Sequence, residues 1–367
     1  MPLTTKDNTH IKLLPLEDYL RGLSEATEAN VKRHFPYGNP EYFQTYQKAK
    51  SLFNEKYYKN MEICSHLDAE HGTVFTKHNI EHIDDVITNA GYLLGLDRPN
   101  ASTTLNGFEA YLLLMAILVH DIGMYIERNG HEKRCEEIMM SHRSELGIGL
   151  AEAKLISKIA AAHTGKDDKG KNRDTIAELF SRELTEEILH RDRAIAAIVR
   201  FADELSEHAK RAYAFVENNP KVNDASKLRH AYCRSIANLK PSLSNQTITI
   251  EFSCSVEQAI KKYKENEKNE TTITLVEHII NALTKLEQER EYCTRYFAEL
   301  TYISGITVCI EIYYIGEHDL HKTIIEISEP IGESGYPGKK KIGEIFKDIN
   351  PENIVSIHSA LHEKQEL

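Results

Sequence analysis

The sequence predicts a mainly α protein, in which an all-helical bundle is followed by a smaller α+β domain with an antiparallel sheet. Three observations predict this fold class. Apolar residues recur with helical spacing from about residue 40 to about residue 218, strand-like alternation replaces this pattern after Pro220, and one long helical stretch returns between the strands. A chain of 367 residues is long enough for about two domains.

The helical half is predicted segment by segment from its amphipathic pattern. The first clear helix has Tyr42, Tyr46, Ala49 and Phe53 on one face. A second helix is expected over about 77–94. A third, over about 105–124, is apolar almost all round and is therefore expected to be buried. Further helices are expected at about 131–143, 148–163, 173–189 and 190–217.

The C-terminal half shows apolar and polar residues in alternation, which is typical of strands. Strands are expected over about 247–252, 306–312 and 323–327, with a helix from Leu275 to about Leu300. The predicted organisation is a helical or irregular extension over 1–45, the helical domain over 46–218, an α+β accessory domain over 225–330 and a C-terminal tail over 331–367.

Composition and charge exclude several classes of protein. Apolar residues make up 41% and charged residues 28%, which is ordinary globular usage and excludes a disordered chain or a coiled-coil rod. The net charge of −11 argues against strong nucleic-acid binding. The longest apolar run, 111–119, is about half the length of a membrane span, and the N-terminus lacks a signal-peptide pattern. We therefore expect a cytoplasmic protein that does not associate with membranes.

Histidine and aspartate residues form an unusual pattern in the helical half. His78 and His82 are four residues apart and share one helix face. The buried third helix ends in the pair His120-Asp121, and a later apolar helix carries Asp203. Charged groups in such apolar surroundings must be compensated. Imidazole and carboxylate are natural ligands of divalent first-row metals, so the pattern indicates a metal site.

This order of residues resembles the HD superfamily of metal-dependent phosphohydrolases over about residues 70–215. The resemblance implies that His82, His120, Asp121 and Asp203 bind a divalent ion. The segment His78-Asn-Ile-Glu-His82 is also similar to mammalian-type cyclic nucleotide phosphodiesterases. That similarity implies that His78 is a catalytic residue that protonates the leaving group, although a lysine, residue 77, stands where those enzymes have tyrosine.

Two further segments are similar to bacterial HD hydrolases that hold two metals. They are His131-Glu-Lys and Ala162-His163-Thr-Gly. The segment Val199-Arg-Phe-Ala-Asp203 is similar to the same hydrolases. This similarity implies that His131 and His163 bind a second ion and that Asp121, also catalytic, bridges both. The cofactor is thus expected to be one or two divalent ions, and Mn, Fe, Mg, Ni, Co and Zn all remain open.

Basic residues near these positions are candidates for binding phosphate. They are Lys77, Arg128, Lys166, Arg200 and Arg211. The expected function is hydrolysis of a phosphoester or phosphoanhydride of a nucleotide (mono-, di- or cyclic) by a metal-activated hydroxide, so the partner would be a phosphorylated small molecule. Two alternatives remain open: a nucleotide-sensing regulatory HD protein with weak or no turnover, and a di-iron HD-fold oxygenase. A homodimer is also expected, because an exposed sheet edge in the α+β domain invites pairing.

Overall fold

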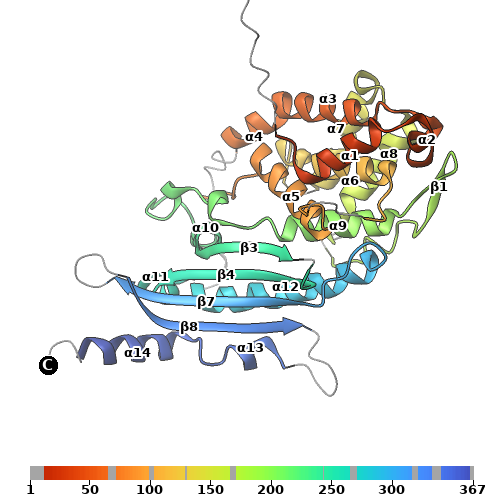
Figure 1. The fold of residues 1–367 in the computed structure, drawn as a ribbon. Coiled ribbons are helices and arrows are strands. Elements are labelled where there is room, and N and C mark those ends of the chain that lie inside the picture. Colours follow the sequence, from red (N-terminus) through yellow and green to blue (C-terminus); the bar gives the residue numbers. More distant parts are fainter. Residues whose placement is uncertain are drawn as a thin grey trace, which may run out of the picture.

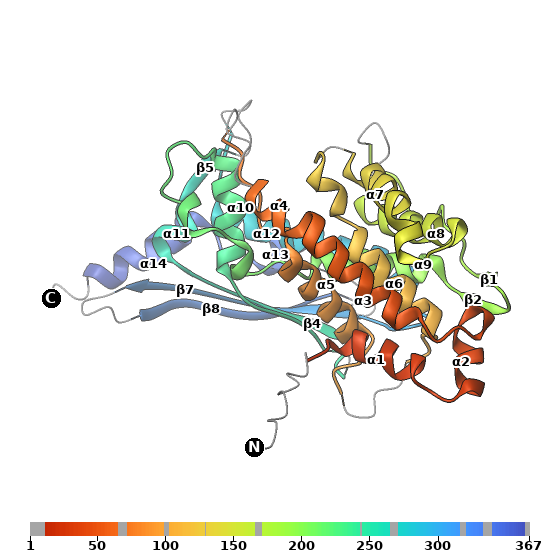
Figure 2. The same ribbon diagram turned by 90° about the horizontal axis from the view of Figure 1, so that it is seen from above.

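The structure is a computed structural model, and it confirms the predicted fold class, with a helical body followed by an α+β part (Figure 1). The described residues are 12–64, 72–98, 103–128, 130–165, 171–242, 244–264, 271–315, 321–332 and 340–363. In Figure 1 the helical body lies above a four-stranded sheet, and the last two helices lie beyond the far edge strand. Figure 2 shows the C-terminus and the β1–β2 hairpin at opposite ends of the molecule.

The helical body contains nine α-helices and one hairpin among the described residues. The helices are α1 (Pro15–Ser24), α2 (Glu28–His34), α3 (Tyr42–Phe53), α4 (Lys59–Cys64), α5 (Ile80–Leu93), α6 (Gly107–Val119), α7 (His131–Leu146), α8 (Leu150–Ala161) and α9 (Asp192–Glu204). Short helical turns are η1 (Pro36–Gly38), η2 (Asn54–Tyr58), η3 (Ile122–Tyr125), η4 (Ala162–Thr164), η5 (Ala209–Arg211) and η6 (Ala214–Val216), and the hairpin strands are β1 (Glu183–Thr185) and β2 (Ile188–His190).

Helix α6 is the centre of the helical body, as its sequence predicts. Every residue from Gly107 to Val119 is buried, and α1, α3, α5, α8 and α9 pack around the helix. Asn106 caps its N-terminus by accepting a hydrogen bond from the backbone N–H of Glu109. The segment Gly107–Tyr125 is long and apolar enough to cross a membrane, but 94% of its most apolar window is buried inside the protein. It is therefore the core helix of this fold.

One predicted helix is wrong, and another is too long. The segment predicted as a helix over 173–189 forms turns and the β1–β2 hairpin instead. Its turn around Asp174 is held by hydrogen bonds from Tyr292 and Tyr296, partners that are distant in sequence. The helix predicted over 190–217 ends at Glu204, where the side chain of Ser206 accepts a hydrogen bond from the Asn89 amide and the chain turns away.

The α+β part begins with a helix that the sequence pattern does not predict. Its helices are α10 (Asp224–Ser235), α11 (Val256–Ile260), α12 (Leu275–Phe297), α13 (Ile342–Ile345) and α14 (Pro351–Glu363). Its strands are β3 (Ile236–Ser242), β4 (Thr247–Ser255), β5 (Lys262–Lys264), β6 (Thr272–Thr274), β7 (Gly305–Ile315) and β8 (His321–Gly332). The region predicted as a C-terminal tail, 331–367, thus contains two helices.

The main sheet is mixed rather than antiparallel, with the strand order β3-β4-β7-β8. Strands β3 and β4 are antiparallel, as are β7 and β8, but β4 and β7 run parallel, with Thr247 opposite Gly305. Parallel neighbours need a crossover connection, and the long helix α12 supplies it here. The alternating residues of β4 and β7 predict the strands correctly but do not contain their relative direction.

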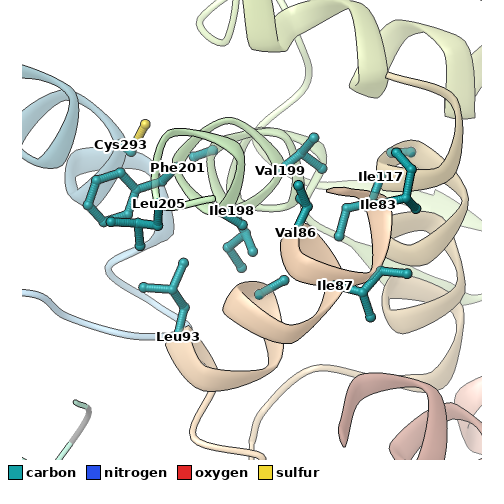
Figure 3. Close-up of a cluster of buried hydrophobic side chains, with 14 of the residues drawn as sticks. Ile83, Val86, Ile87, Leu93, Ile117, Ile198, Val199, Phe201, Leu205 and Cys293 are labelled. Carbon is teal, nitrogen blue, oxygen red and sulfur yellow. The ribbon is translucent and has the colours of Figure 1, made fainter. Parts of the chain in front are cut away.

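Helix α12 joins the two parts, because it packs against α9 as well as against the sheet side of the molecule. Figure 3 shows this junction, where Phe201 and Leu205 lie near Cys293 of α12 while Ile198 and Val86 fill the space between α9 and α5. An ion pair also crosses the junction, since Arg200 of α9 donates two hydrogen bonds to the Glu289 carboxylate at 2.6 and 2.7 Å. Most buried apolar residues of both parts form one continuous core, and Val74, Tyr213, Val216 and Val222 form a separate small cluster.

Candidate metal centre

Five separate elements bring six histidine and aspartate side chains together. His82 lies in the first turn of α5, where Asn79 caps the helix by accepting from the His82 backbone N–H. His120 and Asp121 follow directly after α6, and His131 is the first residue of α7. The remaining two residues are His163 in η4 and Asp203 in the last turn of α9.

Three of these residues form a first potential metal-binding triad: His82, His120 and Asp203. Nε2 of His82 lies 3.2 Å from Oδ1 of Asp203, and Nε2 of His120 lies 3.7 Å from the same oxygen. Both imidazoles are essentially inaccessible to solvent. The three ligand atoms therefore converge on one buried point, as a small cation requires.

The second potential triad consists of Asp121, His131 and His163. Oδ1 of Asp121 lies 3.2 Å from Nε2 of His131 and 3.5 Å from Nε2 of His163. The α7 helix can start this close to Asp121 because Gly123 has no side chain, and a Cβ there would collide with the His131 carbonyl oxygen.

Asp121 belongs to both triads through its two different oxygens. Oδ1 faces the His131 and His163 side, whereas Oδ2 lies 3.4 Å from Nε2 of His120 and 3.9 Å from Nε2 of His82. One carboxylate oxygen is thus directed toward each group of imidazoles. A metal ion at each triad could therefore share this carboxylate.

Backbone carbonyls hold three of the imidazoles in the tautomer that a metal needs. Each ring donates its Nδ1–H to the carbonyl three residues earlier in the chain. The bonds run from His120 to Ile117, from His131 to Arg128 and from His163 to Ala160, at 2.8, 2.9 and 2.6 Å. Because a carbonyl can only accept, Nδ1 carries the proton and Nε2 presents its lone pair to the centre.

The resulting lone pairs need a cation between them. Nε2 of His131 and Nε2 of His163 are 3.2 Å apart and both are acceptors in the neutral rings. Nε2 of His82 and of His120 are buried and have no hydrogen-bond partner in the described part of the chain. Orphaned buried nitrogens are costly unless a proton or a metal satisfies them. These residues therefore fit one or two divalent ions.

The charges of the centre also fit a bound cation. Burial opposes a proton on His120, but the carboxylates of Asp121 and Asp203 outweigh it and raise the pKa of His120 well above its usual value. Burial likewise opposes ionisation of Asp121 and Asp203, yet the neighbouring imidazoles hold the pKa of both carboxyls well below the usual range. The carboxylates are charged and demand positive charge nearby, which an ion can supply in place of a proton.

His78 lies beside the centre and is held by two hydrogen bonds. Its Nδ1–H donates to the Thr76 carbonyl at 2.5 Å, and its Nε2 accepts from Arg211 at 3.1 Å. Burial, reinforced by the charge of Arg211, lowers the pKa of His78 to about 3. Nε2 of His78 thus faces a hydrogen-bond donor in this arrangement, and the proton-donating role of His78 stays a prediction.

The predicted phosphate-binding residues divide into three groups. Arg128 and Arg211 line the cavity beside the centre. Lys77 does not line it, since its ammonium lies over the ring of Tyr213, and Arg200 is held at the α9–α12 junction by Glu289. Lys166 lies outside the described residues. Arg200 was a plausible candidate because it is close to Asp203 in sequence, but the helix turns its side chain toward α12.

A cavity of about 1300 Å³ opens above the triads. Several residues of its wall come from α10 and α12, and the sequence pattern does not reveal that these helices pack against the helical body. Arg229 and Tyr232 come from α10, and His278, Asn281 and Lys285 come from α12. The spacing of the α12 residues is the one signal in the sequence that could have identified them as a single face.

A third group of potential ligands differs from these triads. Glu183, His190 and Asp192 lie close together near the hairpin. However, His190 uses one ring nitrogen on Asp192 at 2.6 Å and the other on Thr185 at 3.0 Å. Both nitrogens are occupied, so this group is a hydrogen-bonded core feature.

The helical fold and the six His and Asp side chains define an HD-type domain. The model of the HD-CE family matches residues 72–289, which is more than half of the chain, and the protein belongs to this family. Comparison with curated proteins gave no match. The matched region contains both triads and also α10 and most of α12, so the helices that form the far wall of the cavity are part of the family unit.

Proposed function

We propose that this HD-CE protein is a metal-dependent phosphohydrolase that cleaves a phosphoester or phosphoanhydride bond of a nucleotide. The observation that carries the proposal is the position of Asp121, whose two oxygens face two separate groups of imidazoles. Divalent ions held by these groups would lower the pKa of water and neutralise charge on phosphoryl oxygens, which is the chemistry that phosphate-ester hydrolysis needs.

The side chains around the centre have complementary tasks. His82, His120 and Asp203 would hold one ion, and His131 and His163 would hold the other, with Asp121 shared. The backbone carbonyls keep the rings fixed, so little rearrangement is required when an ion or a substrate binds. The cofactor would therefore be one or two divalent metal ions.

Arg211 is the residue that we propose to stabilise the charge developing on the phosphoryl group or the leaving oxygen. Its guanidinium is buried and oriented by His78 at 3.1 Å, by the Lys77 carbonyl at 3.1 Å and by Glu207 at 3.3 Å. A fixed positive charge in a site shielded from water is more effective than a mobile one. His78 then acts by positioning Arg211, in place of the proton-donating role inferred from its sequence context.

The charges in the cavity support a phosphorylated substrate. Six cationic and seven anionic side chains line it among the described residues. Two divalent ions would change the balance from slightly negative to clearly positive. Arg128 also stacks on Phe75 at 4.1 Å and has no salt-bridge partner in the described part of the chain, so it is available to an anionic group. Of the two substrate types of HD-fold oxygenases, an uncharged polyol would not need these arginines, whereas an anionic phosphonate would also use them.

The decisive experiment is turnover with a substrate panel. Metal-free protein would be reloaded separately with Mn²⁺, Fe²⁺, Mg²⁺, Ni²⁺, Co²⁺ and Zn²⁺, and then incubated with mono-, di-, tri- and cyclic nucleotides. Phosphate and nucleoside products would be measured separately, with oxygen uptake followed in parallel. A matched pair of variants separates the site from contamination: His120→Ala should abolish turnover, whereas His142→Ala, outside the cavity, should not.

The outcomes separate the three function classes. Metal-dependent phosphate release that is lost in His120→Ala supports hydrolysis. Nucleotide binding without turnover at high protein concentration would replace it with a sensing role, and oxygen uptake with Fe²⁺ would indicate an oxygenase. We further propose a cytoplasmic homodimer without membrane or strong nucleic-acid association, and light scattering of the full-length protein tests the oligomeric part of this proposal.

A further inference from the structure

The wall of the cavity opposite the metal centre is built by two helices of the α+β part. On α12, the cavity-lining residues His278, Asn281, Ala282, Lys285 and Leu286 have the spacing of one helix face. Helix α12 thus packs its other faces against α9 and the sheet while presenting this face to the cavity. Arg229 and Tyr232 of α10 complete the wall.

Tyr232 and His278 form an aromatic platform in this wall. Their rings meet edge to face with centroids 5.3 Å apart, and Phe252 of β4 supports Tyr232 from behind at 6.0 Å. Tyr232 is buried and lines the cavity, and its hydroxyl makes no hydrogen bond within the described residues. A tyrosine hydroxyl can both donate and accept a hydrogen bond, so the hydroxyl of a cavity-lining tyrosine can serve a ligand that binds there.

The α12 face of this wall carries no free positive charge, and the Arg229 guanidinium of α10 lies 3.8 Å from the Glu207 carboxylate. Lys285 is paired with Glu204 at 2.5 Å, so its charge is compensated locally. Burial and the nearby charge of Arg229 lower the pKa of His278 to about 4, which leaves the ring uncharged. The amide of Asn281 is exposed and makes no hydrogen bond to the described residues, so both its donor and its acceptor are available.

We propose that the face formed by Tyr232, His278 and Asn281 binds the nucleobase of the substrate, while the metal centre and its arginines bind the phosphates. This inference rests on the proposed function for the location of the scissile phosphate. A nucleobase is a flat aromatic ring with hydrogen-bond donors and acceptors on its edge, and this wall offers an aromatic platform and neutral polar groups. A further phosphate would instead require free positive charge here, whereas Lys285 is paired with Glu204 and Arg229 with Glu207.

The size of the cavity agrees with a ligand larger than a single phosphate group. Its volume of about 1300 Å³ exceeds the ~300–1,000 Å³ typical of a pocket for a small molecule. The two chemical halves of the cavity also come from different parts of the chain. The helical body would then provide the metal centre for the reaction, and the α+β part would select the substrate.

Asn281 allows a sharp test, because it is exposed and can be replaced without disturbing the core. Binding of adenosine, guanosine, cytidine and uridine 5′-diphosphates to the full-length protein would be measured by calorimetry with Ca²⁺ present. Turnover of bis(p-nitrophenyl) phosphate would be measured with Mn²⁺. The variants are Asn281→Ala and Asn281→Asp, and the matched control is Gln288→Ala, another exposed amide on α12 outside the cavity.

The expected result is that Asn281→Ala weakens binding of the preferred nucleotide by about tenfold, as expected for the loss of one or two hydrogen bonds. Hydrolysis of bis(p-nitrophenyl) phosphate, which lacks the hydrogen-bonding edge of a base, should fall by less than nucleotide binding does. Asn281→Asp should alter the order of preference among the four bases, because a carboxylate can only accept. Gln288→Ala should behave as the wild type in every measurement.

Three results would overturn the inference. They are the absence of any nucleotide binding, equal binding of all four nucleotides that Asn281→Asp leaves unchanged, and equal losses in Asn281→Ala and Gln288→Ala. Failure of the proposed function looks different. In that case neither ester nor nucleotide is hydrolysed, while binding that depends on both the base and Asn281 persists and supports a base site in a sensing protein.

Discussion

Replacing Asp121 by asparagine tests the metal centre most directly. The substitution keeps the size of the side chain but removes its charge, and the amide nitrogen cannot act as a ligand. In the structure Oδ1 of Asp121 lies 3.2 Å from Nε2 of His131 and 3.5 Å from Nε2 of His163. Its Oδ2 lies 3.4 Å from Nε2 of His120. Either orientation of the amide therefore deprives one of the two ion positions of its shared anionic ligand.

The magnitude follows from the lost charge. Two unit charges 4 Å apart interact with about 4 kcal/mol at an effective dielectric constant of 20. This energy corresponds to roughly a thousandfold change in an equilibrium constant. We therefore expect Asp121→Asn to weaken binding of at least one ion by ~10³-fold and to lower turnover by at least ~10³-fold.

Metal content after dialysis, measured by mass spectrometry of the elements, would be combined with turnover of bis(p-nitrophenyl) phosphate. Far-ultraviolet circular dichroism would verify that the helices persist. The control is Asp18→Asn on α1, an exposed residue whose ion pair within the described residues is with Arg21 on the same helix, and it should retain wild-type metal content and activity. An Asp121→Asn protein that keeps the wild-type number of ions and its turnover would refute a shared carboxylate.

Four further expectations follow from the same geometry. His131→Ala should lose one ion and keep the other, as metal analysis would show, and loss of both would mean that the ions bind as one unit. Metal binding should release protons and become tighter as pH rises, because an ion must displace the proton that the carboxylates hold on His120. Calorimetry in two buffers of different ionisation enthalpy measures this proton release. Identical binding heats in the two buffers would contradict it. His78→Gln should keep its metal and lose about tenfold in turnover with good and poor leaving groups alike, whereas a loss confined to poor leaving groups would restore a proton-donating role. Glu289→Ala should lower the free energy of unfolding by about 2–4 kcal/mol in chemical denaturation, because it leaves Arg200 largely buried without its anion, and an unchanged midpoint would show that the junction does not depend on this pair.

Much of the fold follows from local pattern. Helix α6 is apolar on every side, and a helix of that kind can only be a core helix, so its position at the centre of the body was predictable. The strands β4 and β7 alternate strictly because one face of the sheet is buried. The segment over 173–189 was wrongly predicted because hydrogen bonds from tyrosines of α12 hold it in turns, and these partners are more than a hundred residues away.

The candidate site, too, was only partly predictable from the sequence. The sequence alone identifies His82, His120 and Asp203 as potential ligands, because each is a polar group at the end of an apolar helix and such groups need a compensating partner. It also yields the resemblance to HD proteins. It cannot state the protonation of His78, since that depends on burial and on a guanidinium 133 residues further along the chain.

The sequence by itself determined the helical class and the apolar helices, because periodicity is a local property. Residue chemistry indicated His82, His120, Asp121 and Asp203, and the resemblance to HD proteins added His131 and His163. Only the tertiary structure decided that both oxygens of Asp121 face imidazoles and that Arg200 binds Glu289 instead of lining the cavity. It also decided that α12 forms one wall of the cavity. These facts depend on the direction in which side chains point after distant helices have packed together, and no local pattern along the chain records that direction.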